Sequence, residues 1–349
     1  MGYKYTIGIL GSGAWGTALA AHLAGVCGHK VLLWSFDAKA AKAIAKKREN
    51  TQFLPGVALS QNIDVTTNEK ELVANCEMII YATPSAFCEE MAAKLAPQLT
   101  QNSDPSQILI LAAKGLREHD GGLLSDTWME ANPTFKNIAV LSGPTFAREL
   151  AQQKPLTATL AAEDDAVIKR IDAVFNSPLM RFYYNNDIIG AQIGGAVKNV
   201  IAIAAGAADG LEMGEGFKMG LLCRGVVEMM RYSHHLGGNT LTLAGLSGIG
   251  DLTMTATEGS RNYRFGYALG AGKSIAQAKE EVGATIEGIP TAGILTEQGV
   301  TRGIDMGVIM AVHGIVNGDL NPKRTFDLLL TRPRVYEFDN NLTLGELPA

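Results

Sequence analysis

Lys198 is the residue whose surroundings most strongly indicate chemistry. On a helix, its neighbours three and four positions away are small or apolar: Gly194, Gly195, Ile201 and Ala202. An ammonium in such a setting loses hydration, its pKa falls, and it can exchange a proton near neutral pH, as general acid–base catalysis requires. The alternative is a lysine that buries its stem and extends its charge to the surface. We favour the catalytic interpretation.

Lys114 is a second cation placed where ligands are expected. It follows a predicted strand, and in open α/β sheets ligands bind beyond the carboxyl ends of the strands. There its charge would face a substrate oxygen, although a solvated loop lysine explains it equally well. Loops after two other predicted strands carry Thr83-Pro84-Ser85 and the segment 142–147. In the second of these, Gly143 permits close backbone approach and Thr145 offers a hydroxyl.

Further polar groups lie downstream on segments that contain glycine. Asp251 follows the run Leu-Ser-Gly-Ile-Gly, and it either orients Lys198 electrostatically or caps the helix that follows. Arg261 and Asn262 stand side by side, and a guanidinium is a planar fork suited to phosphate. An ordinary turn is the alternative for Ser260-Arg261-Asn262.

A glycine-rich turn precedes the first predicted helix, between the strand Thr6–Leu10 and the helical run Thr17–Ala24. It consists of Gly11, Ser12, Gly13, Ala14, Trp15 and Gly16. The first glycine permits the tight turn, the second lets the backbone approach a pyrophosphate, and the third lets helix and strand pack closely. The anion then meets the free N–H groups of the helix N-terminus. The position of this motif predicts a dinucleotide site.

The residues after the second predicted strand give conflicting indications of NAD or NADP. Asp37 lies about where an acid would bind the ribose 2′-OH, but it is equally suited to cap the following helix. Ser35 could hydrogen-bond a 2′-phosphate, and Lys39 and Lys42 could neutralise it. The cofactor is therefore expected to be NAD or NADP, without a preference.

The first half of the chain alternates short apolar runs with Ala/Lys/Glu-rich helical stretches, which predicts an α/β fold with a mainly parallel, Rossmann-type sheet. The expected strands are Thr6–Leu10, Val31–Trp34, Ile63–Thr66, Met78–Ala82, Ile108–Ala112, Ile138–Leu141, Thr157–Ala161 and Arg181–Tyr184. A helix is expected over about 164–175. Residues 1–188 are predicted to form this dinucleotide-binding domain.

After residue 188 the strand pattern fades, and Ala, Gly, Met and Leu at helical spacing dominate. We therefore expect an all-α substrate and catalytic domain over residues 189–335, with a loosely ordered tail after Arg334. The long apolar run 188–208 carries Gln192, Lys198 and Asn199 near its middle. A membrane would disfavour the lysine by several kcal/mol, so the run is predicted to be a buried helix.

Composition excludes several classes of function. With a net charge of −5 and no basic block, nucleic-acid binding is not expected, and anionic ligands must be held by a few placed cations. The four cysteines form no CxxC pair and the six histidines no ligand spacing, so no metal site is predicted. Well-separated cysteines and the lack of a visible secretory signal indicate the cytoplasm.

Eight motifs in constant order resemble the bacterial NAD(P)-dependent glycerol-3-phosphate dehydrogenases over about residues 5–330. They are the glycine turn with Trp15, Thr83-Pro84-Ser85, Lys114-Gly115, the segments 142–147 (SGPTFA), 195–199 (GAVKN) and 248–252 (GIGDL), Ser260-Arg261-Asn262 and Glu287-Gly288. Two positions depart from the family pattern. Ala14 replaces a frequent Ser, and Ser35-Phe36 stands where His or Arg is frequent, which weakens an assignment to NADP.

The resemblance implies a Rossmann domain joined to a helical domain, an active site between them, and a homodimer. By the same resemblance Lys198 is the proton donor and acceptor, and Lys114 binds substrate and touches the cofactor. The implied substrate residues also include Gly143, Thr145, Asp251, Ser260, Arg261 and Asn262. The implied cofactor contacts include Trp15, Ala147, Arg261 and Glu287.

The predicted activity is hydride transfer between NAD(P)H and dihydroxyacetone phosphate, giving sn-glycerol 3-phosphate for glycerophospholipid synthesis. The expected partner is thus a small phosphorylated substrate, with no stable membrane insertion. Two alternatives remain open from the residues. One is a related two-domain 2-hydroxyacid or ketopantoate reductase, and the other is a nucleotide-sensing regulatory protein that has lost catalysis.

Overall fold

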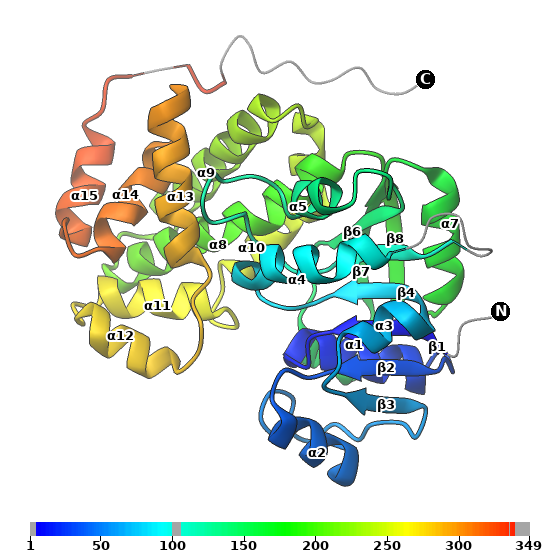
Figure 1. Ribbon diagram of the computed structural model, residues 1–349. Coiled ribbons are helices and arrows are strands. Elements are labelled where there is room, and N and C mark those ends of the chain that lie inside the picture. Colours follow the sequence, from blue (N-terminus) through cyan, green and yellow to red (C-terminus); the bar gives the residue numbers. More distant parts are fainter. Residues whose placement is uncertain (1–4, 100–105, 335, 339–349) are drawn as a thin grey trace. The chain divides into compact units, whose positions relative to one another are not determined.

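The computed structural model describes residues 5–99, 106–334 and 336–338, which form two compact units (Figure 1). The N-terminal unit comprises Met1–Arg117 and Leu124–Ile188, and the C-terminal unit comprises Glu118–Leu123 and Ile189–Ala349. The short segment 118–123 was not expected in the second unit. It is fastened there by Tyr232, whose buried hydroxyl donates to the carbonyl oxygen of Gly121 at 2.9 Å. The expected loose tail lies largely outside the described residues.

The described part of the N-terminal unit contains one eight-stranded sheet in the order β3-β2-β1-β4-β5-β6-β7-β8. All neighbouring strands are parallel except β6 and β7. The strands are β1 Tyr5–Leu10, β2 Val31–Trp34, β3 Ile63–Thr66, β4 Cys76–Tyr81, β5 Ile108–Leu111, β6 Ile138–Ser142, β7 Leu156–Ala162 and β8 Met180–Asn185. The predicted mainly parallel sheet is therefore confirmed, with each expected strand in place.

Helices cover both faces of this sheet. They are α1 Ala14–Gly25, α2 Ala38–Lys47, α3 Lys70–Asn75, α4 Cys88–Leu95, α5 Leu124–Ala131, α6 Ala147–Ala151 and α7 Asp165–Val174. Alternate strand residues point to opposite faces. Ile7 and Ile9 join a core with α1, α6 and α7, whereas Tyr81 packs edge-on against Trp128 of α5. Both faces are buried, which explains why the strands read as continuous apolar runs.

The sheet order reverses between β1 and β4. In open α/β sheets the ligand crevice lies outside the carboxyl ends of the strands at such a switch point. The glycine turn follows β1, and the loop that contains Thr83 follows β4. The fold thus places both loops at the expected nucleotide position.

The described part of the C-terminal unit is all α, as predicted. Its helices are α8 Ile188–Gly210, α9 Glu215–His235, α10 Asp251–Thr255, α11 Arg261–Gly270, α12 Ile275–Val282, α13 Gly288–Arg302, α14 Gly307–Val316 and α15 Pro322–Leu330. A 3₁₀ turn, Thr240–Ala244, and a π-helical turn, Leu246–Gly250, precede α10. Helix α8 is long and apolar enough to cross a membrane, but 94% of its most apolar window is buried. This burial identifies it as the core helix of the unit.

Glycines let α8 and α11 pack backbone against backbone. A Cβ atom on Gly206 would lie 2.0 Å from the carbonyl oxygen of Tyr263, and one on Gly266 would lie 2.0 Å from that of Ile203. Any larger residue at either position would force the helices apart. The close packing therefore holds the beginning of α11 beside the part of α8 that carries Lys198.

Glu228 of α9 is a buried carboxylate that caps another helix. Its side chain is 2% exposed, and its two oxygens accept the backbone N–H groups of Val308 and Ile309 at 2.7 and 3.0 Å. Burial is the main reason that the pKa of Glu228 is raised to about 7; the two N–H groups and Arg231 lower it, and Asp305 adds to the rise. Glu228 therefore exchanges its proton near neutral pH in the folded protein.

We expect Glu228 to make the free energy of unfolding decrease as the pH rises. Because its pKa is about 7 in the folded protein and the ordinary value of a glutamate is 4.5, the folded chain binds more protons between these pH values. The contribution is largest below pH 4.5, declines up to about pH 7, and amounts to about 3 kcal/mol. Urea unfolding from pH 5 to 8 should show a flatter profile for Glu228→Gln than for the wild type. Parallel profiles would contradict this origin.

Candidate active site

The glycine turn after β1 has the geometry of a dinucleotide cradle. Gly11 has a φ of 124°, and a Cβ there would lie 2.8 Å from the carbonyl oxygen of Ala82. A Cβ on Gly16 would lie 2.0 Å from the carbonyl oxygen of Gly11, so α1 could not pack on the strand without this glycine. A Cβ on Gly13 would meet nothing within 4 Å. The backbone at Gly13 is thus open for close approach of a pyrophosphate at the N-terminus of α1.

Side chains hold this turn in place from three directions. Ser12 Oγ donates to Ser35 Oγ at 2.8 Å. Asn50 Nδ2 donates to the Ser12 carbonyl at 2.7 Å and to Thr17 Oγ1 at 2.8 Å. Thr83 Oγ1 donates to the Leu10 carbonyl at 2.8 Å. Asn50 was missed by sequence reasoning, because no local pattern connects it to the turn 38 residues earlier.

Ser35 and Asp37 follow β2, and the arrangement of Ser35 differs from the expected contact with a 2′-phosphate. Ser35 is 1% exposed, and its hydroxyl accepts from Ser12 and donates to the Asp37 carbonyl oxygen at 3.4 Å, so it does not present a free hydroxyl to a 2′-phosphate. Asp37 caps α2, because its Oδ1 accepts the backbone N–H of Lys39 at 2.7 Å. The predicted capping role of Asp37 is confirmed. Phe36, between them, is 87% exposed.

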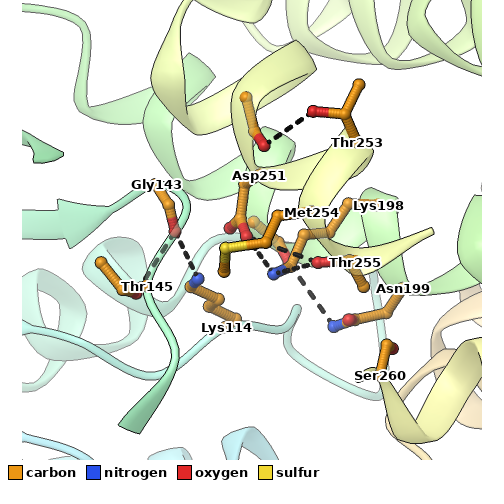
Figure 2. Close-up of polar contacts among 12 residues, drawn as sticks. Lys114, Gly143, Thr145, Lys198, Asn199, Asp251, Thr253, Met254, Thr255 and Ser260 are labelled. Atoms are coloured by element: carbon orange, nitrogen blue, oxygen red, sulfur yellow. Dashed lines mark hydrogen bonds and ion pairs between the residues drawn. The ribbon is translucent and has the colours of Figure 1, made fainter. Parts of the chain in front are cut away.

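Lys114 lies where the loops after three strands meet. Its Nζ donates to the carbonyl oxygen of Gly143 at 3.0 Å (Figure 2). The same oxygen also accepts from Thr145 Oγ1 at 3.3 Å. Gly143 has a φ of 126°, a conformation that favours glycine. A Cβ on Gly115 would lie 2.3 Å from Ser85 Oγ, so the loops after β4 and β5 are in direct contact. The loop residues singled out from the sequence are thus brought together.

Two further predicted cofactor residues belong to helices that flank the glycine turn. Trp15 of α1 and Ala147 of α6 are partly buried and pack against the same apolar core. Ala14 is the first residue of α1, and Gly13 provides its N-cap without a side-chain hydrogen bond. The Ser that is frequent at position 14 in the family would thus add a hydroxyl at the helix N-terminus.

Lys198 is buried, with 6% of its surface exposed, and it has two polar partners in Figure 2. Its ammonium forms an ion pair with Asp251, which is fully buried, and donates to Thr255 Oγ1 at 2.9 Å. The alternative of a surface-reaching lysine is therefore wrong. The suggested partnership of Lys198 with Asp251 is confirmed, and the carboxylate and hydroxyl come from a segment 53 and 57 residues away.

Asp251 reaches Lys198 because glycines remove the side chains that would block it. Asp251 is the first residue of α10, whose N-cap is Gly250, and it follows the π-helical turn Leu246–Gly250. A Cβ on Gly194 would lie 2.1 Å from the Ser247 carbonyl oxygen, and one on Gly248 would lie 1.9 Å from that of Leu243. The turn therefore packs directly on α8, one helical turn before Lys198. Thr255, which sequence reasoning missed, stands four residues after Asp251 on the same face of α10.

The beginning of α11 gathers the remaining predicted residues of the C-terminal unit. Ser260 is the N-cap, and its Oγ accepts the backbone N–H of Tyr263. Arg261 is exposed, whereas Asn262 is buried and donates to Asn199 Oδ1 at 3.0 Å. Glu287, just before α13, accepts from Asn199 Nδ2 at 3.3 Å. Asn262 and Glu287 thus belong to one polar group, and Asn199, which sequence reasoning did not assign to the site, joins them.

The glycine cradle at a sheet switch point and the buried Lys198–Asp251 pair define a class of protein, the Rossmann-type oxidoreductases that act with a nicotinamide nucleotide. Comparison with known sequences gives the particular family. The profile for the N-terminus of NAD-dependent glycerol-3-phosphate dehydrogenase matches residues 6–168, and the profile for its C-terminus matches residues 187–327. The chain therefore belongs to the NAD-dependent glycerol-3-phosphate dehydrogenase family.

Individual relatives agree with this assignment. Glycerol-3-phosphate dehydrogenase (NAD(P)+) from Rhodospirillum rubrum is 37% identical over 328 residues, covering 94% of this chain and 92% of that protein. The corresponding enzyme from Alkalilimnicola ehrlichii is 39% identical and covers 94% and 97%. The crystal structure of glycerol-3-phosphate dehydrogenase from Coxiella burnetii has a TM-score of 0.88 at 33% identity, covering 94% and 99%. The family uses NAD or NADP, as predicted.

Gly194→Ala should impair both stability and catalysis. The added methyl group would overlap the Ser247 carbonyl, and overpacking of this kind typically costs about 1–3 kcal/mol. Because the displaced turn carries Asp251, we expect kcat to fall about tenfold or more as well. Gly220→Ala in α9 is the control, since its Cβ would meet nothing within 4 Å and alanine favours a helix. Thermal unfolding and steady-state kinetics of both variants test this; wild-type kcat in Gly194→Ala would refute it.

Proposed function

We propose that this chain catalyses the reversible reduction of dihydroxyacetone phosphate to sn-glycerol 3-phosphate with NADH or NADPH. The observation that carries the proposal is the buried Lys198–Asp251–Thr255 group in a chain whose two halves match both halves of the dehydrogenase family. The product is the backbone of glycerophospholipids, so the reaction supplies glycerophospholipid synthesis. The presence of both Lys198 and Lys114 speaks against a regulator without catalysis.

The N-terminal unit binds the nucleotide in this proposal. Backbone N–H groups of residues 11–16 and the N-terminus of α1 hold the pyrophosphate, because the open position at Gly13 leaves room for it. When bound, the nicotinamide supplies or accepts the hydride. Trp15, Lys114 and Ala147 are the further contacts that this unit contributes, and Arg261 and Glu287 are those of the C-terminal unit.

Lys198 transfers the proton. As the carbonyl oxygen of the substrate gains negative charge, Lys198 Nζ donates a proton to it, and in the reverse reaction the neutral amine accepts one. Asp251 favours the protonated ammonium and Thr255 Oγ1 fixes its direction, since both already accept from Nζ. Their role is to hold the proton on the atom that must deliver it.

In this proposal the phosphate and the reacting portion of the substrate are bound by different residues. Arg261 and Asn262 bind the phosphate together with Ser260, because they stand at the N-terminus of α11, where a guanidinium and free N–H groups favour an anion. Lys114, Gly143 and Thr145 bind the oxygens of the reacting portion. Binding energy from the remote phosphate thus fixes the position of the reacting carbon.

Turnover should require Lys198. Absorbance at 340 nm with dihydroxyacetone phosphate, measured with NADH and NADPH in parallel, tests the reaction and reveals the preferred cofactor. Lys198→Met should lower kcat about 10²-fold or more, while nucleotide binding measured by NADH fluorescence persists. Unimpaired turnover by this variant would refute the proposed proton transfer. Wild-type turnover of a 2-hydroxyacid or ketopantoate substrate in place of dihydroxyacetone phosphate would favour the alternative reductase.

Two controls separate chemistry from folding. Lys198→Met removes the ion-pair partner of the buried Asp251, which is strongly destabilising, so Lys198→Arg provides a variant that keeps the charge and is expected to remain folded with low turnover. Lys218→Met removes another lysine of the same unit, one that is paired with Asp209 and Glu215. It should keep nearly full turnover.

The proposal includes a homodimer in the cytoplasm. The resemblance to the bacterial enzymes supports the dimer, and the four free cysteines are consistent with a reducing compartment. Light scattering after size exclusion should give twice the chain mass of 37.0 kDa. A concentration-independent mass of one chain would overturn the dimer.

A further inference from the structure

Asn199 lies beside Lys198 in α8, but its side chain serves different partners. It is 4% exposed. Its Oδ1 accepts from Asn262 Nδ2 at 3.0 Å, and its Nδ2 donates to Glu287 Oε2 at 3.3 Å and to the Gly195 carbonyl at 3.5 Å. One amide therefore joins the beginning of α11 to the residue that precedes α13.

The hydrogen-bond network fixes the orientation of both amides. Gly288 donates its backbone N–H to Asn262 Oδ1 at 3.0 Å, so Asn262 must direct its Nδ2 toward Asn199. Asn199 must then present its oxygen to Asn262 and its nitrogen to Glu287. Rotating either amide by half a turn would set donor against donor. The resulting order, Gly288 to Asn262 to Asn199 to Glu287, has a single direction.

Close packing leaves this network little freedom. A Cβ on Gly288 would lie 2.7 Å from the Asn199 carbonyl oxygen and 2.9 Å from Asn262 Oδ1. The beginning of α13 therefore rests directly on α8 and on the Asn262 side chain. If Glu287 moves, the Asn199 amide must move with it, and Asn262 must then follow Asn199.

We propose that Asn199 is a positioning residue that couples nucleotide binding to substrate binding. The inference rests on the proposed function, in which Glu287 contacts the cofactor and Asn262 the substrate phosphate. A nucleotide that fixes Glu287 also fixes the Asn199 side chain. Asn199 in turn fixes the Asn262 amide, whose second N–H donates to the phosphate. The coupling is reciprocal, because each ligand changes the affinity for the other by the same factor.

The coupling is measured as the Kd of NADH, from its fluorescence, with and without saturating glycerol 3-phosphate. This pair of reduced ligands undergoes no reaction, so the readout is independent of turnover. Glycerol 3-phosphate should tighten NADH binding to the wild type about fivefold or more, within the usual range of such couplings. In Asn199→Leu, which removes both side-chain hydrogen bonds and keeps a helix-forming residue, the ratio should fall to about one.

Charge variants test the direction of the network and cover the possibility that Asn199→Leu does not fold. Asn199→Asp keeps the acceptor for Asn262 but sets a carboxylate against Glu287, so NADH binding should weaken about tenfold with a smaller change in KM for dihydroxyacetone phosphate. In the double variant Asn199→Asp/Glu287→Gln, the amide introduced at position 287 donates to the carboxylate introduced at position 199. This variant should recover most of the NADH affinity. Glu287→Gln alone is the matched control.

The outcomes distinguish the two proposals. Lack of turnover of dihydroxyacetone phosphate by the wild type would overturn the proposed function. If the wild type turns over, the coupling role is overturned by any of three results: no effect of glycerol 3-phosphate on NADH affinity, a wild-type ratio in folded Asn199→Leu, or no recovery in folded Asn199→Asp/Glu287→Gln.

Discussion

The burial of the Lys198 ammonium against Asp251 is the constraint on which the C-terminal unit depends. Removing two charges from water costs several kcal/mol for each ion, and their attraction offsets this only with good geometry and further hydrogen bonds. Asp251 is fully buried, and Thr255 Oγ1 accepts a further hydrogen bond from the ammonium. A protein that needed only stability would be served as well by apolar residues. The pair is therefore consistent with the proton transfer proposed for Lys198.

The surrounding helices supply the geometry that this pair requires. Helix α8 is almost entirely buried, so its apolar residues contribute stability that offsets the cost of its one lysine. Glycines replace side chains where other backbone segments must come close, at Gly194 beneath the π-helical turn and at Gly206 beneath α11. These contacts bring Asp251 to Lys198 and the beginning of α11 to Asn199. The apolar and polar features of α8 are thus parts of one arrangement.

The fold could be predicted well because each strand carries its own signal. Parallel strands buried on both faces read as continuous apolar runs, and β2 and β3 have the predicted bounds. The site was harder to predict, because its contacts join distant segments. For Asp251 the sequence left two roles open, orienting Lys198 or capping the next helix. Nothing in the local sequence indicated that Thr255 or Asn50 belongs to a site. The placement of segment 118–123 depends on Tyr232, 111 residues from Gly121, and no periodicity reveals such a contact.

The chain carries a net charge of −5 and yet acts on anionic ligands. A long-range positive field cannot be the source of affinity, because screening limits exposed charges to about 8–10 Å at physiological salt. The structure instead presents individual cations and N–H groups at fixed points: Lys114 held by the Gly143 carbonyl, Lys198 held by Asp251, and the N-termini of α1 and α11. Each of these groups acts over a short distance and is oriented by its neighbours. Individually placed cations of this kind are compatible with an acidic chain.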